Sequence, residues 1–305
     1  MNLKRLFLLS LCLSFLSFKS HAGQFNPRDA MIEYDKLERV ILDSSDDAVR
    51  RGERFEAFYR QTFLANMPNA EIDNLQKSEI VFHFDAVKKA AFYSLSPDIS
   101  MVMRRIFDRL VLLEMAKSID FEAMYRNYLA TRDFDSARLF LKKYPALDLP
   151  MLPEISLLVS SEKVERFEWQ VSAVGRTLAQ REVFIPMGPF VLILASPQCG
   201  FSRTALHDIF SDKHLKGLIS QRTRLMVPPD YNFDFSGVQA WNDLNPSMKM
   251  SIIDKRSDWP EIREWETPTF YFYRDRRLVS MVIGWPRPSG NKDELIAAFR
   301  KIGVN

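Results

Sequence analysis

The pattern of the amino-acid sequence changes near the middle of this chain, between Tyr144 and Pro153. Before this point, over residues 23–147, apolar residues recur at helical spacing with little β-branched alternation. The stretch at the change reads YPALDLPMLP, and its closely spaced prolines favour a stiff, extended connection. We therefore predict an all-α helical domain over residues 23–147, a linker over 148–164 and a second domain over 165–305.

The first half contains residues that are typical of the N-terminal ends of capped helices. Asn26-Pro27 is a good pair for an N-cap and first turn, and Ser96-Pro97-Asp98 opens a strongly apolar helix. The segment Phe121–Pro145 reads as two antiparallel helices joined near Asp133. No second copy of this segment follows at a fixed period, so we expect one hairpin within a helical bundle and not a solenoid.

The second half alternates strands with helices. Residues Phe167–Val174 and Thr177–Ile185 read as a hairpin with a turn at Gly175-Arg176, and the apolar run Pro189–Ser196 suits a strand buried on both faces. This alternation predicts an α/β domain with a mixed sheet. The other predicted elements are a helix from Phe201, strands at Arg224–Val227, Thr269–Tyr273 and Leu278–Ile283, and a closing helix at Asn291–Ile302.

The longest apolar run in the chain lies at its start. Residues 1–22 show a basic n-region with Lys4 and Arg5, an apolar h-region of 13 residues from Leu6 to Phe18, and small residues at the end. This h-region is shorter than the roughly 17–25 residues that a spanning helix needs. We therefore predict a cleaved signal peptide at residues 1–22, a secreted protein, and no transmembrane anchor after cleavage.

Cleavage would change the charge balance. The chain has 42 Lys+Arg, 39 Asp+Glu and a formal net charge of +3. Lys4, Arg5 and Lys19 would leave with the signal peptide and no acid would, so the mature chain would be formally neutral. Because no Lys/Arg-rich run follows, we predict that the protein does not bind nucleic acid.

Cleavage would also remove Cys12, one of two cysteines, and leave Cys199 as a single thiol in an oxidising compartment. One thiol cannot close an internal disulfide, so Cys199 is an inert buried residue, an intermolecular cross-link or a reactive group. It directly follows the apolar strand and begins a helix. Unpaired backbone N–H groups and the helix dipole at such a position favour the thiolate and lower a cysteine pKa below its free value of about 8.5.

The order of these motifs resembles the thioredoxin superfamily over about residues 165–303. The resemblance is carried by the strand, turn and helix around Cys-Gly-Phe-Ser (199–202), then by Thr267-Pro268 before two strands, Gly284 and a last helix. It implies that Cys199 attacks the substrate disulfide, that Pro268 follows a cis peptide bond, and that the backbone at Thr267 pairs with the substrate. The hairpin at Gly175 and the secretory signal look most like the periplasmic redoxin branch, which implies a periplasmic location.

The sequence departs from this family at functional positions. Ser202 replaces the second cysteine of Cys-x-x-Cys, and a serine hydroxyl cannot resolve a mixed disulfide. Gln198 stands where a tryptophan usually precedes the motif, and Pro228–Met248 reads as an insertion. We assign Cys199, Ser202 and Pro268 as candidate catalytic residues, and Thr267, Gly200 and Phe201 as candidate substrate-binding residues.

Three hypotheses about function follow. In the first, Cys199 performs monothiol exchange with, or capture of, a client protein or a low-molecular-weight thiol, while the helical domain binds partners or forms a homodimer. In the second, the fold is a non-catalytic binding or assembly scaffold. In the third, the protein is a thiol peroxidase, because LASPQCGFS (194–202) is similar to the motif of glutathione peroxidases. Gln239 and Trp241-Asn242 are the candidates for the supporting glutamine and tryptophan of those enzymes, although the motif that surrounds them there is absent here.

Other chemistry finds little support in the sequence. The histidines after residue 22 are His83, His207 and His214, and they form no pair or Cys-His cluster at metal-binding spacing. His207 lies two turns along the helix from Cys199, so we expect a surface or packing role for it. No Gly-rich phosphate loop occurs. We therefore predict no metal and no cofactor.

Overall fold

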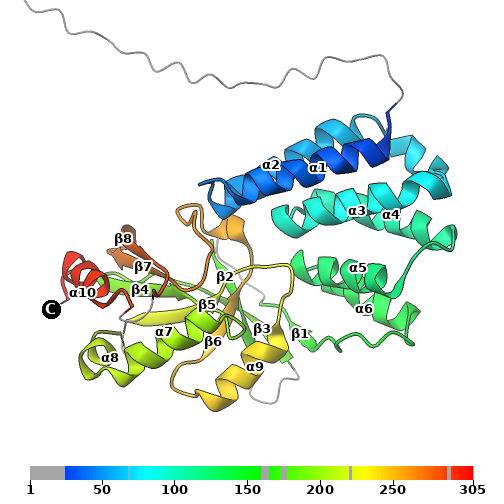
Figure 1. Ribbon diagram of the computed structural model, residues 1–305. Helices are drawn as coiled ribbons and strands as arrows, with labels where there is room; N and C mark the ends of the chain where they lie inside the picture. Colours follow the sequence, from blue (N-terminus) through cyan, green and yellow to red (C-terminus); the bar gives the residue numbers. More distant parts are fainter. Residues whose placement is uncertain are drawn as a thin grey trace, which may run out of the picture.

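The structure is a computed structural model that describes residues 25–67, 69–158, 165–172, 177–219, 222–286 and 290–304. The predicted signal peptide and the turn at Gly175-Arg176 lie outside these residues. In the described part of the chain, helices form one side of the molecule and a sheet with its covering helices forms the other (Figure 1). We call residues 27–143 the helical half and residues 154–304 the sheet half.

The helical half consists of packed, mostly antiparallel helices. Asn26 and Asp47 accept hydrogen bonds from backbone N–H groups of the first turns that follow them, and Asp133 does the same for the last helix of this half. The helices are α1 (Pro27–Leu42), α2 (Ala48–Tyr59), η1 (Arg60–Leu64, a π-helix), η2 (Asn69–Asn74, a 3-10 helix), α3 (Lys77–Ser94), α4 (Pro97–Leu112), α5 (Ser118–Ala130) and α6 (Phe134–Lys143). The predicted hairpin joined near Asp133 is confirmed as α5 and α6.

The sheet half contains eight strands among the described residues, in the order β1-β3-β2-β6-β5-β4-β7-β8. Strand β4 pairs in parallel with β5, and β5 with β6, whereas β7 and β8 run antiparallel to their neighbours. The predicted mixed sheet is therefore confirmed. The strands are β1 (Glu154–Ser156), β2 (Phe167–Val171), β3 (Thr177–Glu182), β4 (Pro189–Leu194), β5 (Thr223–Val227), β6 (Met250–Ile253), β7 (Thr269–Arg274) and β8 (Arg277–Ile283).

The helices of the sheet half are α7 (Gly200–Ser211), α8 (Lys213–Ile219), α9 (Phe235–Leu244), the 3-10 turn η3 (Arg256–Asp258) and α10 (Lys292–Lys301). Strand β6 and helix α8 were not predicted, and two further elements lie in segments that were predicted to be a linker and an insertion. Strand β1 lies inside the predicted linker, where three residues beside prolines are too short to show a strand pattern. Helix α9 lies inside the predicted insertion, where the Asp234 side chain caps it by accepting the Gly237 N–H at 2.8 Å.

The two halves share one continuous apolar core. Phe134 of α6 packs edge-on against Trp169 of β2, with ring centroids 5.0 Å apart, and also contacts Phe233, 5.5 Å away. Polar contacts reinforce this packing: the Tyr231 hydroxyl donates to the Ala123 carbonyl of α5 at 2.5 Å. No helix among the described residues is both long and apolar enough to cross a bilayer.

His83 gives the helical half a pH-dependent stability. Its side chain is buried on α3 against Phe63, its Nδ1 has no hydrogen-bond partner, and burial lowers its pKa to about 4. An unfolded histidine titrates near pH 6.5, so the unfolded chain binds the proton first as the pH falls. Above about pH 6.5 the neutral His83 makes its full contribution to the free energy of unfolding. About 2 kcal/mol of this contribution should be lost by about pH 5.

The test is urea denaturation of the protein and of His83→Leu at neutral pH and at pH 5. As the pH falls to 5, the unfolding free energy of the unmodified protein should decrease by about 2 kcal/mol more than that of His83→Leu. An unchanged difference would contradict a neutral, buried His83.

Candidate active site

The site begins where β4 ends and α7 begins. Strand β4 is buried along almost its whole length. Its pairing with β5 ends with the backbone hydrogen bond from the Ala195 N–H to the Met226 carbonyl. The chain then turns, with the Cys199 N–H donating to Ser196 O at 3.1 Å, and α7 starts at Gly200. Cys199 is therefore the N-cap residue of α7, with extended backbone, as the sequence predicts.

The sulfur of Cys199 meets a segment that lies 68 residues further along the chain. Its thiol donates to the backbone carbonyl of Thr267 at 3.3 Å. The Thr267–Pro268 peptide bond is cis, as predicted, and the Pro268 carbonyl accepts the Gly284 N–H at 2.8 Å. The structure thus brings together Cys199, Thr267 and Pro268, three of the residues assigned from the sequence.

Ser202 lies one helical turn after Cys199 and is completely buried. Its hydroxyl accepts the Ser196 N–H at 3.2 Å, so the oxygen is held in place by the turn that precedes the helix. Because that bond uses the oxygen as acceptor, the hydroxyl proton stays free to be donated to the neighbouring sulfur. Ser202 is therefore placed to support the Cys199 thiolate.

The surroundings of Cys199 favour its ionised form. Partial burial of the sulfur raises the pKa, but hydrogen bonds from the Thr267 side chain, from the Ser202 backbone and hydroxyl, and from the Phe201 N–H outweigh it. The net result is a Cys199 pKa below its ordinary value. A thiolate is the nucleophilic form of cysteine, so this sulfur is suited to attack a disulfide or another electrophilic sulfur.

The other two assigned residues leave the sulfur accessible. Phe201 is 62% exposed, although it is large and apolar. Gly200 is exposed, and a Cβ added to it would come within 4.0 Å of only the Arg203 side chain. The surface around Cys199 is therefore open on this side and offers an apolar ring for contact.

No pattern in the sequence indicates that the helical half reaches this site. At the N-terminus of α2, Asp47 pairs with Arg263 at 3.1 Å, and Arg51 pairs with Glu266, the residue before Thr267, at 3.4 Å. These partners are more than 200 positions apart, so no local pattern could show them. The helical half therefore borders the segment that holds Thr267.

Gln198 makes a similar connection on another side. Its amide donates to Asp234 Oδ2 at 2.7 Å, and Asp234 is also the cap of α9. Gln198 thus ties the turn before Cys199 to the predicted insertion. This role depends on tertiary structure and could not be read from the motif.

The remaining candidates do not join the site. The Trp241 indole donates to Met248 O, and the Asn242 side chain bonds to the backbone of Met250, so both stabilise the connection from α9 to β6. His207 is a surface residue with its side chain 79% exposed, as expected. Among the described residues, no cluster of His, Cys, Asp or Glu could hold a metal ion.

Comparisons with protein-family models, with curated proteins and with solved structures found no match to this chain. A functional proposal must therefore start from the geometry of Cys199 and its neighbours.

Proposed function

We propose that this protein is a thioredoxin-like protein in which Cys199 performs monothiol exchange with a disulfide or thiol of a client protein. The observation that carries the proposal is the position of the Cys199 sulfur. Cys199 is the N-cap residue of α7, its sulfur lies 3.3 Å from the Thr267 carbonyl oxygen, and its pKa is lowered. A lone inert cysteine needs none of these features.

The arrangement of elements supports this proposal. Strand β4, helix α7 and strand β5 form a parallel unit, and β7, β8 and α10 follow as an antiparallel hairpin and a closing helix. In the sheet, β4 lies between β5 and β7. This order is similar to that of a thioredoxin domain, in which the reactive cysteine follows the central strand. Fold alone does not fix function, so the chemistry of the cysteine decides.

The proposed reaction is a thiol-disulfide exchange. The Cys199 thiolate attacks one sulfur of a client disulfide, a bond forms between these two sulfurs, and the original bond breaks. The departing client thiolate takes a proton from water, and no external oxidant is consumed. The Ser202 hydroxyl donates to the sulfur but cannot attack the mixed disulfide. The thiolate of a low-molecular-weight thiol then attacks the client sulfur of the mixed disulfide, a new disulfide forms between the small thiol and the client, and Cys199 leaves as a free thiolate.

The cellular setting belongs to the same proposal. We place the protein in the periplasm, where disulfides persist, because residues 1–22 read as a secretory signal. The helical half would provide the partner-binding surface or a homodimer contact. If Cys199 were inert, the protein would instead be an assembly scaffold.

Alkylation of Cys199 with iodoacetamide tests the proposal. The rate should follow a titration with an apparent pKa below about 8.5. Ser202→Ala removes a hydrogen bond to a charged group, worth about 1.5 kcal/mol, so it should raise this pKa by about one unit. Intact mass after incubation with glutathione disulfide should show one glutathione adduct.

Ser257→Ala is the matched control, because Ser257 is exposed and its hydroxyl donates to the neighbouring Asp258, not to Cys199. It should leave the titration unchanged, and Cys199→Ser should give neither alkylation nor adduct. A thiol that titrates at or above about 8.5 and forms no adduct would overturn the exchange proposal in favour of a scaffold.

A further inference from the structure

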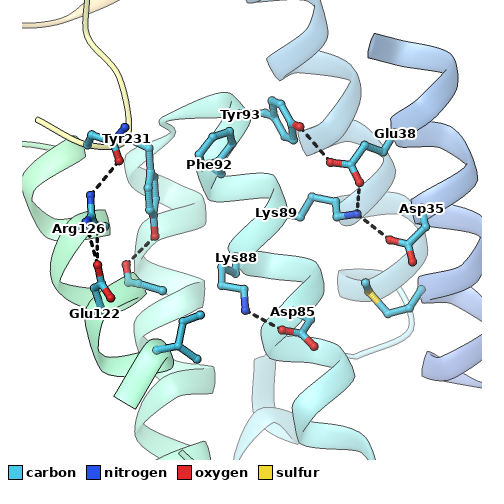
Figure 2. Close-up of a pocket in the computed structure, with 14 residues that line it drawn as sticks. Asp35, Glu38, Asp85, Lys88, Lys89, Phe92, Tyr93, Glu122, Arg126 and Tyr231 are labelled. Carbon is cyan, nitrogen blue, oxygen red and sulfur yellow. Dashed lines mark hydrogen bonds and ion pairs between the residues drawn. The ribbon is translucent and has the colours of Figure 1, made fainter. Parts of the chain in front are cut away.

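A cleft lies along helix α5 between the two halves. Its first cavity, of 620 Å³, lies between α1, α3 and α5 (Figure 2). Its second, of 380 Å³, lies between α5 and residues 232–236 and extends to Gln198, the residue before Cys199. The cavities adjoin at Glu122, Arg126 and Asn232, which line both. We call the joined cavities the α5 cleft.

The first cavity presents apolar surface without a partner. Phe92 is 47% exposed on α3, with its ring centroid 4.9 Å from that of Tyr93 and 5.3 Å from that of Tyr231. Ile119, at the start of α5, is 64% exposed. Large apolar side chains that stay exposed within a concave surface are typical of a binding site.

The charges of this cavity favour a positively charged occupant. Lys89 is held by both Asp35 and Glu38, at 2.6 and 2.5 Å, so two carboxylates surround one ammonium group (Figure 2). Lys88 and Arg126 each have their own carboxylate partner, at 2.7 and 2.8 Å. Among the described residues that line the cavity, carboxylates therefore exceed cations by one.

The exposed fractions of these side chains add to the excess of negative charge that a ligand would meet. The side chain of Asp35 is 51% exposed and that of Glu122 is 47% exposed, whereas that of Lys89 is only 16% exposed. The carboxylates thus stand toward solvent and the ammonium group of Lys89 lies beneath them. An approaching ligand meets negative charge beside an apolar ring.

We propose that the α5 cleft binds an extended segment of the client polypeptide, in which arginine or lysine stands next to a large apolar residue. The inference rests on the proposed function, because the cleft extends to Gln198, the residue before Cys199, and a client bound there would bring its cysteine toward Cys199. The basic residue would face Asp35, Asp85 or Glu122, and the apolar residue would pack on Phe92.

A cysteine-free peptide tests the cleft separately from the thiol. Fluorescein-labelled GSRFGLRSG is titrated with the full chain and followed by fluorescence anisotropy. It should bind about tenfold more tightly than GSEFGLESG or GSRSGSRSG. Phe92→Ser should weaken binding of the first peptide about tenfold. Asp85→Asn should weaken it a few-fold, because it removes one rim charge.

Met101→Ser is the matched control, since Met101 is 62% exposed on α4 and does not line the cleft. It should leave binding unchanged. Equal or tighter binding of the acidic peptide, or unchanged binding by Phe92→Ser, would overturn the proposal.

The two proposals can fail separately. If the basic peptide, extended by a cysteine in a mixed disulfide with glutathione, transfers that disulfide to Cys199 equally fast in Phe92→Ser and in the unmodified protein, the cleft proposal fails and exchange stands. If the cysteine-free peptide binds as expected but Cys199 forms no mixed disulfide, exchange fails and the cleft stands as a binding site.

Discussion

Replacing Arg132 with methionine should lower the free energy of unfolding by about 3–5 kcal/mol. Arg132 follows the end of α5, and its side chain is only 5% exposed. Its guanidinium donates to the Leu129 and Ala130 carbonyls and, across the contact between the two halves, to the Ile253 carbonyl at 2.9 Å. Methionine preserves the apolar length but none of these donors.

The charge of Arg132 adds to the expected loss. Burial lowers its pKa to about 10, so it stays charged at neutral pH, and its Nε lies 3.6 Å from the buried carboxylate of Asp254. The guanidinium also lies over the Phe233 ring, 4.1 Å from its centroid. Its removal would leave Asp254 with the Trp169 indole, which donates at 2.7 Å, as its remaining close partner. A buried carboxylate without its counter-charge is costly.

Urea denaturation of full-length protein measures the effect, with Arg138→Met as the matched control. Arg138 lies on α6, is 56% exposed, and pairs with Asp135, which is 92% exposed. The control should change stability by less than about 1 kcal/mol, because exposed ion pairs contribute little. Equal effects of the two substitutions would show that Arg132 does not tie the halves together.

The local structure of the sheet half could be read from the sequence because it depends on local pattern. The apolar run of β4 and the turn residues after it specify a buried strand and a helix start, and both are present. Strands β1 and β6 were not predicted. They have three and four residues, and their place in the sheet depends on distant partners: β1 pairs with β3, and β6 with β2 and β5.

The candidate site likewise combines features that depend on local sequence with features that depend on distant partners. The position of Cys199 at a helix start follows from its neighbours in the sequence, whereas its approach to Thr267 was implied only by the resemblance to a family. The contacts that surround the site could not be predicted from the sequence. The bond from Arg126 to Asn232, two residues that line both cavities of the α5 cleft, joins residues 106 positions apart. Side chains of this kind carry no periodicity that marks them as partners.

Ser202→Cys should convert the protein from a monothiol to a dithiol. The Ser202 side chain is within hydrogen-bonding reach of the Cys199 sulfur, so a thiol there would be held next to any mixed disulfide. Its thiolate would attack the Cys199 sulfur, release the client thiol and leave an internal disulfide between positions 199 and 202. Because this attack is intramolecular, reduction of insulin with dithiothreitol as the reductant should rise about 100-fold or more.

Mass spectrometry under non-reducing conditions should show oxidised Ser202→Cys as a species lighter by two hydrogens, with no accumulated glutathione adduct. The substitution should cost about 1 kcal/mol of stability, because sulfur is a weaker acceptor for the Ser196 N–H than the hydroxyl it replaces.

Ser211→Cys, at the far end of the same helix α7, adds a thiol without placing it near Cys199, and it should leave insulin reduction at the level of the unmodified protein. If both variants increase turnover equally, the added thiol acts from solution and the geometry at position 202 is irrelevant. If Ser202→Cys forms no internal disulfide and still accumulates the adduct, the side chain at 202 does not face the sulfur. In that case the serine at position 202 would not be the reason for a long-lived mixed disulfide at Cys199.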